Sequence, residues 1–291
     1  MSKENLCVDF PMKSVLTVKL PAMIESLRLF TSLLVPAVVY IGGLVAGASF
    51  LSLPLFLAMI SFFMLGAGSM PLNDYLDRKI DAVVHPNRPI PSERVQPNEL
   101  LILSLVLFAS GLVLSFFVNL LCFGLVCFTI VFIFLYELFF KKMGFAGNIV
   151  VAFLSAMSFT FGSSAVGNPL ASLFLSIIAF LLFTGREILK DVEDVKGDEG
   201  VRDTLPMSVG ERNAAIVGSV FILAGVLFTP IPYLFNQLGV GYLISIALVD
   251  ILGLYAVVRT LQDLRHTTKT VSLLRVASGL GIFSFLIGTI F

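Results

Sequence analysis

The sequence predicts an all-α membrane protein in which nine transmembrane helices surround a central cavity. Three observations carry this prediction: the composition, the length of the uncharged runs and the distribution of charge along the chain. Hydrophobic residues make up 57% and charged residues 13% of the 291 residues, whereas a soluble domain has about half apolar and about a quarter charged residues. We therefore expect one transmembrane domain over 1–291, with a cytoplasmic lead-in over 1–20.

The long uncharged runs set the number of helices. A helix needs about 20 residues, at about 1.5 Å each, to cross the hydrocarbon core. The run from Leu29 to Asn73 contains no charged residue, so it holds two spans rather than one. Breaks at Gly, Pro, Ser and Asn divide this run and the later ones in the same way. The nine expected helices cover 27–47, 52–76, 99–118, 120–140, 147–165, 168–190, 213–232, 240–259 and 272–290.

Charge falls on alternate connections between these helices. The connections after the odd helices, near Ser49, Asn119, Gly167 and Gln237, are uncharged, and so is the C-terminus. The connections after the even helices carry nearly every ionisable residue. Because cytoplasmic loops are enriched in Lys and Arg, we expect a multi-pass protein of the cell membrane, with the N-terminus cytoplasmic and the C-terminus outside. The cations that set this orientation are Lys3, Lys13, Lys19, Arg28, Arg88, Arg94, Lys141, Lys142 and those in 186–212 and 259–269.

Two stretches of the chain share one acidic spacing, DxxDxxxD. Residues three and seven apart fall within about 60° of one another on an α-helix, so each trio forms a stripe of carboxylates on one face. A proline follows each trio after eight residues, Pro89 in the first and Pro206 in the second. This repetition indicates two copies of one helical unit that face each other across a cavity on the cytoplasmic side. The trios are Asp74, Asp77 and Asp81, and Asp191, Asp194 and Asp198.

The carboxylate stripes predict a site for a magnesium diphosphate. Three like charges on one stripe repel one another unless something neutralises them. Mg²⁺ prefers one or two carboxylates together with phosphate oxygens and water, and cations beside both motifs could bind the phosphates. The alternative is that these aspartates only mark the water interface and cap helices. The repeated spacing favours the site over that alternative.

At these residues the sequence resembles the UbiA superfamily of intramembrane prenyltransferases. NDYLDRKID, from Asn73 to Asp81, is similar to the family's NDxxDxxxD, and NRPIPS over 87–92 resembles the loop that follows it. The second motif, GREILKDVEDVKGD over 185–198, is closest to the branch that includes archaeal digeranylgeranylglyceryl phosphate synthase. With the helix layout, the resemblance covers nearly the whole chain.

The resemblance implies a reaction and a set of site residues. Mg²⁺ held by all six aspartates would bind a prenyl diphosphate, whose C–O bond breaks to leave an allylic cation for an acceptor nucleophile. Asp77, Asp191 and Asp194 are expected at the centre, and the ring of Tyr136 could stabilise the cation. An interfacial anchor is the alternative for Tyr136. The resemblance implies substrate binding by Arg28, Asn73, Arg88, Lys141, Lys190 and Arg202.

Two positions depart from the family pattern. The first-helix motif Arg-Pro-x-Asn reads Arg28, Leu29, Phe30, Thr31 here, so its proline and asparagine are missing. Glu93 stands where a glycine commonly follows the NRPIPS loop. Arg28 remains the expected diphosphate ligand. The contribution that the asparagine makes to the site in other members of the family is in doubt here.

The resulting functional hypothesis is a Mg²⁺-dependent intramembrane prenyltransferase. It would move a geranylgeranyl group from geranylgeranyl diphosphate to the hydroxyl of geranylgeranylglyceryl phosphate, as in archaeal ether lipid synthesis. An aromatic prenyltransferase of the same superfamily, making quinone or chlorophyll-type products, stays open. A cation transporter would place acidic residues on helices broken near the bilayer midplane, but both stripes lie at helix ends. The expected partners are the prenyl diphosphate, a lipid-soluble acceptor and membrane lipids, with no nucleic acid and no obligate protein partner.

Other conspicuous residues have a structural interpretation. Asp250 is a carboxylate near the middle of an expected span, where an ionisable residue is a functional candidate by default. Its helix carries neither motif, so a paired or protonated, hydrogen-bonded acid is the favoured interpretation. Gly42, Gly43 and Gly47 form a small-residue face that lets helices pack closely.

Overall fold

The computed structural model describes residues 15–198 and 203–290, and within these ranges it contains helices and connections but no β-strand. The predicted all-α class is confirmed for this part of the chain. The α-helices, in order, are α2 (Leu20–Ser26), α3 (Leu29–Ser32), α4 (Leu34–Val45), α5 (Leu53–Val84), α6 (Pro97–Val118), α7 (Leu120–Leu138), α8 (Phe145–Ala165), α9 (Leu173–Asp198), α10 (Leu205–Val209), α11 (Glu211–Phe228), α12 (Ile231–Leu234), α13 (Val240–Gln262) and α14 (Thr267–Gly288).

Several of these helices can cross a bilayer. Seven helical segments in the described part of the chain are long and apolar enough to span, and the bent pair Thr17–Ser26 and Leu29–Val45 makes an eighth if it is one span. Helix α9 is outside this count because Arg186, Glu187 and Lys190 interrupt its apolar stretch. The protein is therefore a multi-pass membrane protein. The seven segments are α5, α6, α7, α8, α13, Glu211–Leu234 and Leu264–Gly288.

Both acidic motifs lie on longer helices than the sequence predicted. Helix α5 runs on to Val84 instead of ending at 76, and α9 runs on to Asp198 instead of ending at 190. With 32 residues, α5 is about 48 Å long, which exceeds a hydrocarbon core of about 30 Å. Asp74 comes 21 residues after Leu53, about 31 Å along the axis. The first motif therefore begins where the helix leaves the apolar layer.

The first expected helix, over 27–47, is broken near its start. Arg28 has a φ of 46°, in the left-handed region that non-glycine residues rarely occupy. The break separates α2 from α3 and α4 and bends the two parts by 40°. The hydroxyl of Ser32 donates a 2.7 Å hydrogen bond to the carbonyl of Leu27, which satisfies a backbone group that the break frees. The sequence offered no Gly or Pro at this point, so the break was not predicted.

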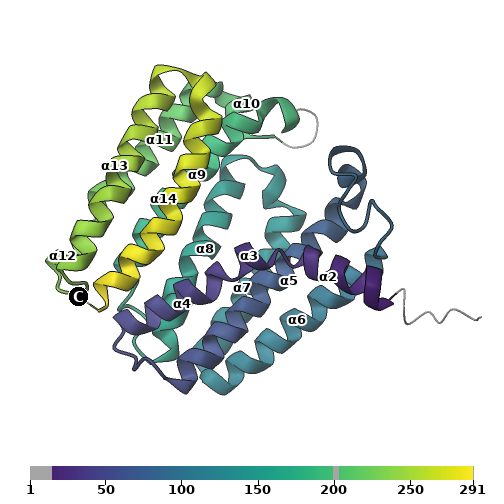
Figure 1. Ribbon diagram of the computed structural model, residues 1–291, viewed down its shortest axis with the longest axis horizontal. Coiled ribbons are helices and arrows are strands. Elements are labelled where there is room, and N and C mark those ends of the chain that lie inside the picture. The colour runs from purple at the N-terminus through teal and green to yellow at the C-terminus, as the bar shows by residue number, and fades with distance from the viewer. Residues whose placement is uncertain (1–14, 199–202, 291) are drawn as a thin grey trace, which may run out of the picture.

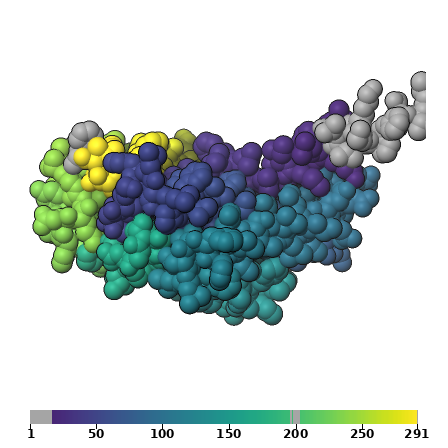
Figure 2. Space-filling model, turned by 90° about the horizontal axis from the view of Figure 1, so that it is seen from below, coloured from purple at the N-terminus to yellow at the C-terminus, as the bar shows by residue number. Residues whose placement is uncertain are grey.

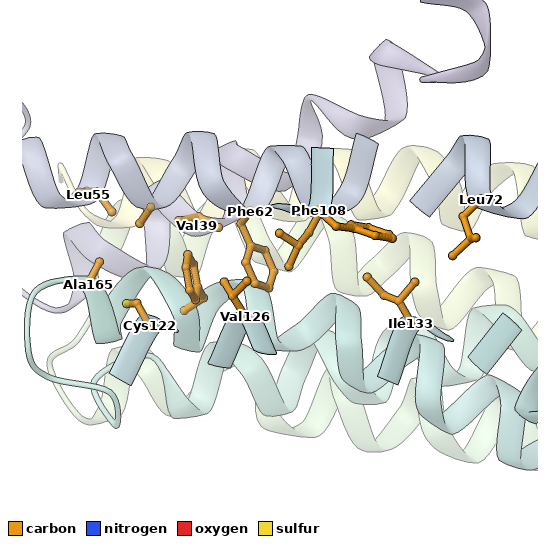
Figure 3. Packing of buried hydrophobic residues seen from close by; sticks show 12 residues of the cluster. Val39, Leu55, Phe62, Leu72, Phe108, Cys122, Val126, Ile133 and Ala165 are labelled. Carbon is orange, nitrogen blue, oxygen red and sulfur yellow. The ribbon is translucent and has the colours of Figure 1, made fainter. Parts of the chain in front are cut away.

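The helices form two groups that share α8 and α9 as their boundary (Figure 1). The first group packs α4 to α8 around one apolar core, which includes Val39, Phe62, Phe108 and Ile133 (Figure 3). The second group packs α9, α11, α13 and α14 around further cores. Helix α14 also contacts α4, and Figure 2 shows the turn between α4 and α5 beside the C-terminal end of α14.

Small residues allow the closest helix contacts, as predicted for Gly42 and Gly43. A Cβ on Gly42 would lie 2.1 Å from the carbonyl oxygen of Phe159 on α8, and one on Gly43 would lie 2.4 Å from the side chain of Leu55. The prediction was wrong for Gly47, which has open space around it and a φ of +88°. Gly47 serves the turn after α4, where a left-handed conformation favours glycine.

Candidate active site

The two acidic motifs lie at the same end of the molecule. The C-terminal ends of α5 and α9 both point towards the top of Figure 1, and the turn between α7 and α8 lies between them. Helix α8 packs against both α5 and α9. The predicted placement of both motifs on one side of the bundle is therefore confirmed.

Each aspartate of the first motif has a cation, and the three cations come from three different elements. Side chains of Asp74 and Asp81 are only 4% and 5% exposed, and that of Asp77 is 24% exposed. Buried charges need such partners, because an unpaired buried charge costs several kcal/mol. The pairs are Arg28 Nη2 with Asp74 Oδ1 at 2.8 Å, Arg88 Nη1 with Asp81 Oδ2 at 2.7 Å and with Asp74 Oδ1 at 3.7 Å, and Lys141 Nζ with Asp77 Oδ2 at 2.7 Å.

Glu137 joins this cluster and was not predicted. Its side chain, 7% exposed, accepts a 2.9 Å bond from Lys141 and two 3.2 Å bonds from the amide of Asn73. Lys141 lies one turn further along the chain, in the short segment after α7, so it bridges Glu137 and Asp77. The four side chains tie the end of α7 to the first motif. Glu137 follows Tyr136 directly, and that ring is half-buried on the same last turn of α7.

The aspartates of the second motif have different partners from those of the first. Asp191 is buried and accepts a 2.8 Å hydrogen bond from the amide of Asn148 on α8. Asp194 is half-buried, one turn further on, and has no hydrogen bond or ion pair with any described residue. The side chain of Asp198 and the whole of Arg202 lie outside the described residues. Asn148 was missed because its importance comes from a contact between helices that no local motif records.

Two cations on α9, Arg186 and Lys190, belong to one further cluster. Lys190 lies 3.8 Å from Glu187, and Arg186 lies 3.2 Å from the same carboxylate. Lys190 was predicted to bind substrate, whereas Arg186 and Glu187 were not singled out. The sequence signal was available, since an Arg-Glu pair near the middle of a largely apolar helix is unusual.

The proline-rich loop after the first motif is fixed at both ends. The Arg94 guanidinium donates two hydrogen bonds to the Glu25 carboxylate on α2, at 2.5 Å and 3.0 Å. This pairing raises the pKa of the Arg94 guanidinium, so its charge is permanent. Near the start of the loop, Arg88 folds back onto Asp81. The loop is therefore ordered against the motif, with Arg88 inside it.

A backbone contact links the turn between α7 and α8 to the chain that follows the second motif. Met143, in the turn between α7 and α8, forms a backbone bridge with Asp203, in the segment that follows the second motif. Gly144 has a φ of +52°, and a Cβ there would lie 3.0 Å from the carbonyl oxygen of Asp203. Glycine is needed at this position both for its conformation and for the close approach of the two backbones.

The donor set fits a magnesium ion completed by phosphate. The described residues contain no group of three acidic, His or Cys side chains close enough to form a protein-only metal cage. Mg²⁺ usually takes one or two carboxylates and fills its octahedron with water and phosphate oxygens. Asp77, Asp191 and Asp194 supply carboxylate oxygens of that kind on two sides of one end of the bundle.

Asp250 takes no part in either motif. Its Oδ2 accepts a 2.8 Å hydrogen bond from the hydroxyl of Thr229, at the end of α11. The predicted hydrogen bond of this carboxyl group is therefore present, while its buried Oδ1 has no partner among the described residues. His85 is exposed at the end of α5.

The sequence profile of the UbiA prenyltransferase family matches residues 33–279. The chain belongs to the UbiA prenyltransferase family. Its similarity to curated members extends over most of both chains. A digeranylgeranylglyceryl phosphate synthase of Methanococcus maripaludis is 35% identical over 276 residues, which cover 93% of this chain and 98% of that one. The synthase of Methanopyrus kandleri is 35% identical over 249 residues, or 85% and 92% of the two chains.

Solved structures of UbiA proteins share the fold. A structure of digeranylgeranylglyceryl phosphate synthase has a TM-score of 0.80 at 29% identity and covers 94% of this chain and 99% of its own. A UbiA homologue from Archaeoglobus fulgidus bound to DMAPP and Mg²⁺ has a TM-score of 0.67 at 18% identity. The match covers 91% of this chain and 99% of that chain. The latter likeness concerns the fold alone.

Proposed function

We propose that this protein transfers a geranylgeranyl group from geranylgeranyl diphosphate to the hydroxyl of geranylgeranylglyceryl phosphate, with Mg²⁺ as cofactor. The observation that carries the proposal is the position of two acidic stripes at one end of the bundle (Figure 1), with Arg28, Arg88 and Lys141 paired to the aspartates of the first stripe. The curated relatives that bear the name of this synthase support the choice of acceptor.

The reaction breaks one C–O bond and forms another. The bond between C1 of the prenyl chain and the diphosphate breaks, and the diphosphate leaves with the electron pair. The acceptor hydroxyl oxygen bonds to C1 and loses its proton, which the released diphosphate can accept. Bound Mg²⁺ would neutralise charge on the diphosphate as a Lewis acid. The surrounding apolar helices exclude water, which would otherwise capture the allylic cation.

The protein's own residues have separate parts in this scheme. The aspartates of both motifs supply the metal ligands, with Asp77, Asp191 and Asp194 at the centre. Arg28 and Arg88 reach the diphosphate by exchanging a carboxylate partner for a phosphate oxygen, and fixed cations aimed at developing charge are a large source of catalysis. The further proposed roles are substrate binding by Asn73, Lys141, Lys190 and Arg202, metal binding by Asp74, Asp81 and Asp198, and stabilisation of the allylic cation by Tyr136.

The proposed topology has nine spans in one domain over 1–291. Helix α9, with 26 residues, is about 39 Å long and reaches across the core. Added to the seven apolar segments and the bent first pair, it makes nine, with the N-terminus and both motifs on the cytoplasmic side and the C-terminus outside. Labelling of single cysteines introduced at His85 and Leu51 in intact cells tests this. A membrane-impermeant reagent should react only at Leu51, and reaction at His85 alone would reverse the orientation.

The reaction itself is tested with purified protein in lipid nanodiscs. Labelled geranylgeranyl diphosphate and Mg²⁺ are supplied with geranylgeranylglyceryl phosphate or with a panel of aromatic acceptors. We expect transfer to the phosphorylated glycerol lipid and loss of transfer when the metal is chelated. Transfer to an aromatic acceptor alone would instead assign the protein to the aromatic prenyltransferases of the family. Metal flux into liposomes without any transfer would contradict the enzyme assignment.

A further inference from the structure

Helix α9 carries three ionisable residues deeper in the bundle than its acidic motif. They are Arg186, Glu187 and Lys190. Arg186 precedes Asp191 by five residues, about 7.5 Å along the axis, and follows the start of the helix at Leu173 by about 20 Å. At this depth in a bilayer an ionisable side chain is expensive to bury and marks a functional site by default.

These side chains lie on the face of α9 that is turned away from its main packing partner. A Cβ on Gly185 would lie 2.6 Å from the carbonyl oxygen of Gly218 on α11, and Leu189 belongs to the core that α9 and α11 share. At about 100° per residue, Arg186 lies about 100° and Lys190 about 140° around the helix from Gly185. The charges therefore do not belong to the interface between α9 and α11.

The cluster continues the acidic stripe inwards and carries excess positive charge. Glu187 lies one turn before Asp191 and seven residues before Asp194, on the same side of the helix. Both cations share the Glu187 carboxylate, with Arg186 Nη1 at 3.2 Å and Lys190 Nζ at 3.8 Å. Two cations against one carboxylate leave a net charge of about +1, so an anion would be attracted here.

The Arg186 guanidinium is fixed in place but incompletely bonded. Its side chain is 15% exposed and its guanidinium carbon lies 5.0 Å from the ring centre of Phe183. The Nε atom is buried and has no hydrogen-bond partner among the described residues. A buried N–H without a partner is destabilising, and the planar fork of arginine suits two-point contact with a phosphate. The missing partner is therefore an anion with two or more oxygens.

The cations of the first motif do not meet this need. Arg28, Arg88 and Lys141 are each paired with an aspartate of α5, in a separate cluster. Two anion sites are required when both substrates carry phosphate, because the donor has a diphosphate and the proposed acceptor has a phosphomonoester.

We propose that Arg186 and Lys190 bind the phosphate of the lipid acceptor, a prenylated glyceryl phosphomonoester. Glu187 is a positioning residue, which holds the two cations when the phosphate is absent. This assignment rests on the proposed function, since a non-phosphorylated aromatic acceptor would need no such site. It places the acceptor headgroup against α9, next to Asp191.

The test compares Arg186→Gln with the wild-type protein on two acceptors. One is geranylgeranylglyceryl phosphate, and the other is geranylgeranylglycerol, which has the same hydroxyl without the phosphate. We expect the KM for the phosphorylated acceptor to rise about 10- to 100-fold in the variant, as for the loss of a charge-assisted bond pair. With geranylgeranylglycerol the two proteins should agree within about twofold, and the KM for geranylgeranyl diphosphate should not change. Lys190→Gln should give a smaller effect of the same kind, because the ammonium lies further from Glu187.

Matched controls separate this role from a structural one. Arg186→Lys keeps the charge but loses the fork, so it should recover part of the loss. Arg212→Gln removes an exposed arginine at the start of α11 and should behave as wild type. An equal loss with both acceptors, a raised KM for the diphosphate, or a lowered melting temperature that accounts for the loss would overturn the assignment. Wild-type protein that prenylates neither acceptor would contradict the proposed function itself, and the assignment with it.

Discussion

The two acidic motifs have the same spacing but different surroundings. In the first, every aspartate is paired with a cation, and the cations come from the break before α3, the proline-rich loop and the segment after α7. In the second, Asp191 is bonded to a neutral amide and Asp194 has no partner among the described residues. Among the described residues, the first motif is therefore neutralised by cations, whereas the contact of Asp191 with Asn148 is to a neutral side chain.

The difference bears on how the proposed metal site would form. Carboxylates that are already paired with Arg or Lys compete poorly for Mg²⁺ until those cations move elsewhere. The proposed movement of Arg28 and Arg88 to a phosphate would therefore free Asp74 and Asp81 for the metal.

The largest expected effect comes from removing a central carboxylate on either side. Asp77→Ala and Asp191→Ala should each lower kcat by about 10³-fold or more, because both are proposed to hold the metal that neutralises the leaving group. Turnover of labelled geranylgeranyl diphosphate measures this. Asp263→Ala, in a loop where the carboxylate contacts only Arg265 and His266, is the control. Activity within a few-fold of wild type in either variant would remove that residue from the site.

A second experiment separates the neutralised first motif from the second motif. Lys141→Gln should lower kcat about 10- to 100-fold and also lower the Mg²⁺ concentration that gives half-maximal activity, because Asp77 and Glu137 lose their shared cation. Asn148→Ala removes only a neutral amide from Asp191, so it should lower kcat about tenfold with an unchanged Mg²⁺ requirement. Metal titrations of activity measure both. The same Mg²⁺ dependence in both variants would show that the two motifs do not differ in this way.

Two close helix contacts, one between α4 and α8 and one between α9 and α11, should differ in their tolerance of a methyl group. A Cβ on Gly162 would lie 1.8 Å from the carbonyl oxygen of Val39, and one on Gly185 would lie 2.6 Å from that of Gly218. Both contacts are with backbone, so each Ala substitution should destabilise the fold by about 1–3 kcal/mol, with Gly162→Ala the worse of the two. Thermal unfolding in detergent, followed by circular dichroism, measures this. Unchanged melting temperatures would mean that the helices can move apart enough to accommodate the methyl group without a loss of stability.

The smallest expected effect concerns a hydrogen bond between α6 and the helix of the first motif. The buried hydroxyl of Ser104 on α6 donates to the carbonyl of Gly68 at 2.7 Å, close to Pro71 in α5. Ser104→Ala should lower the free energy of unfolding by about 0.6 kcal/mol and leave turnover unchanged. A loss of activity without a loss of stability would indicate that this bond sets the position of Asp74.

The sequence was sufficient for the features that depend on composition and spacing. Apolar runs defined the helices, and the repeated DxxDxxxD placed both motifs at one end, because helical periodicity is a local property. The helix ends were wrong where charged residues continued a helix beyond the apolar layer, as at Val84. The break at Arg28 was missed because no residue near it disfavours a helix.

The missed site residues share one cause. Glu137 and Asn148 matter because helices distant in the sequence bring Asn73 and Asp191 to them. Partner choice of this kind is decided by tertiary packing, and a spacing rule along one helix contains no information about the facing helix. The prediction for Gly47 was wrong for a different reason. Its spacing fitted a helix-packing face, whereas its backbone conformation serves a turn.

The bridge between Met143 and Asp203 has a mechanical consequence. The link is made by backbone atoms, so it persists whatever side chains stand at these two positions. It joins the turn that follows Lys141 to the segment that leaves the second motif. The bridge therefore couples the position of the turn that follows Lys141 to the position of the chain that follows the second motif.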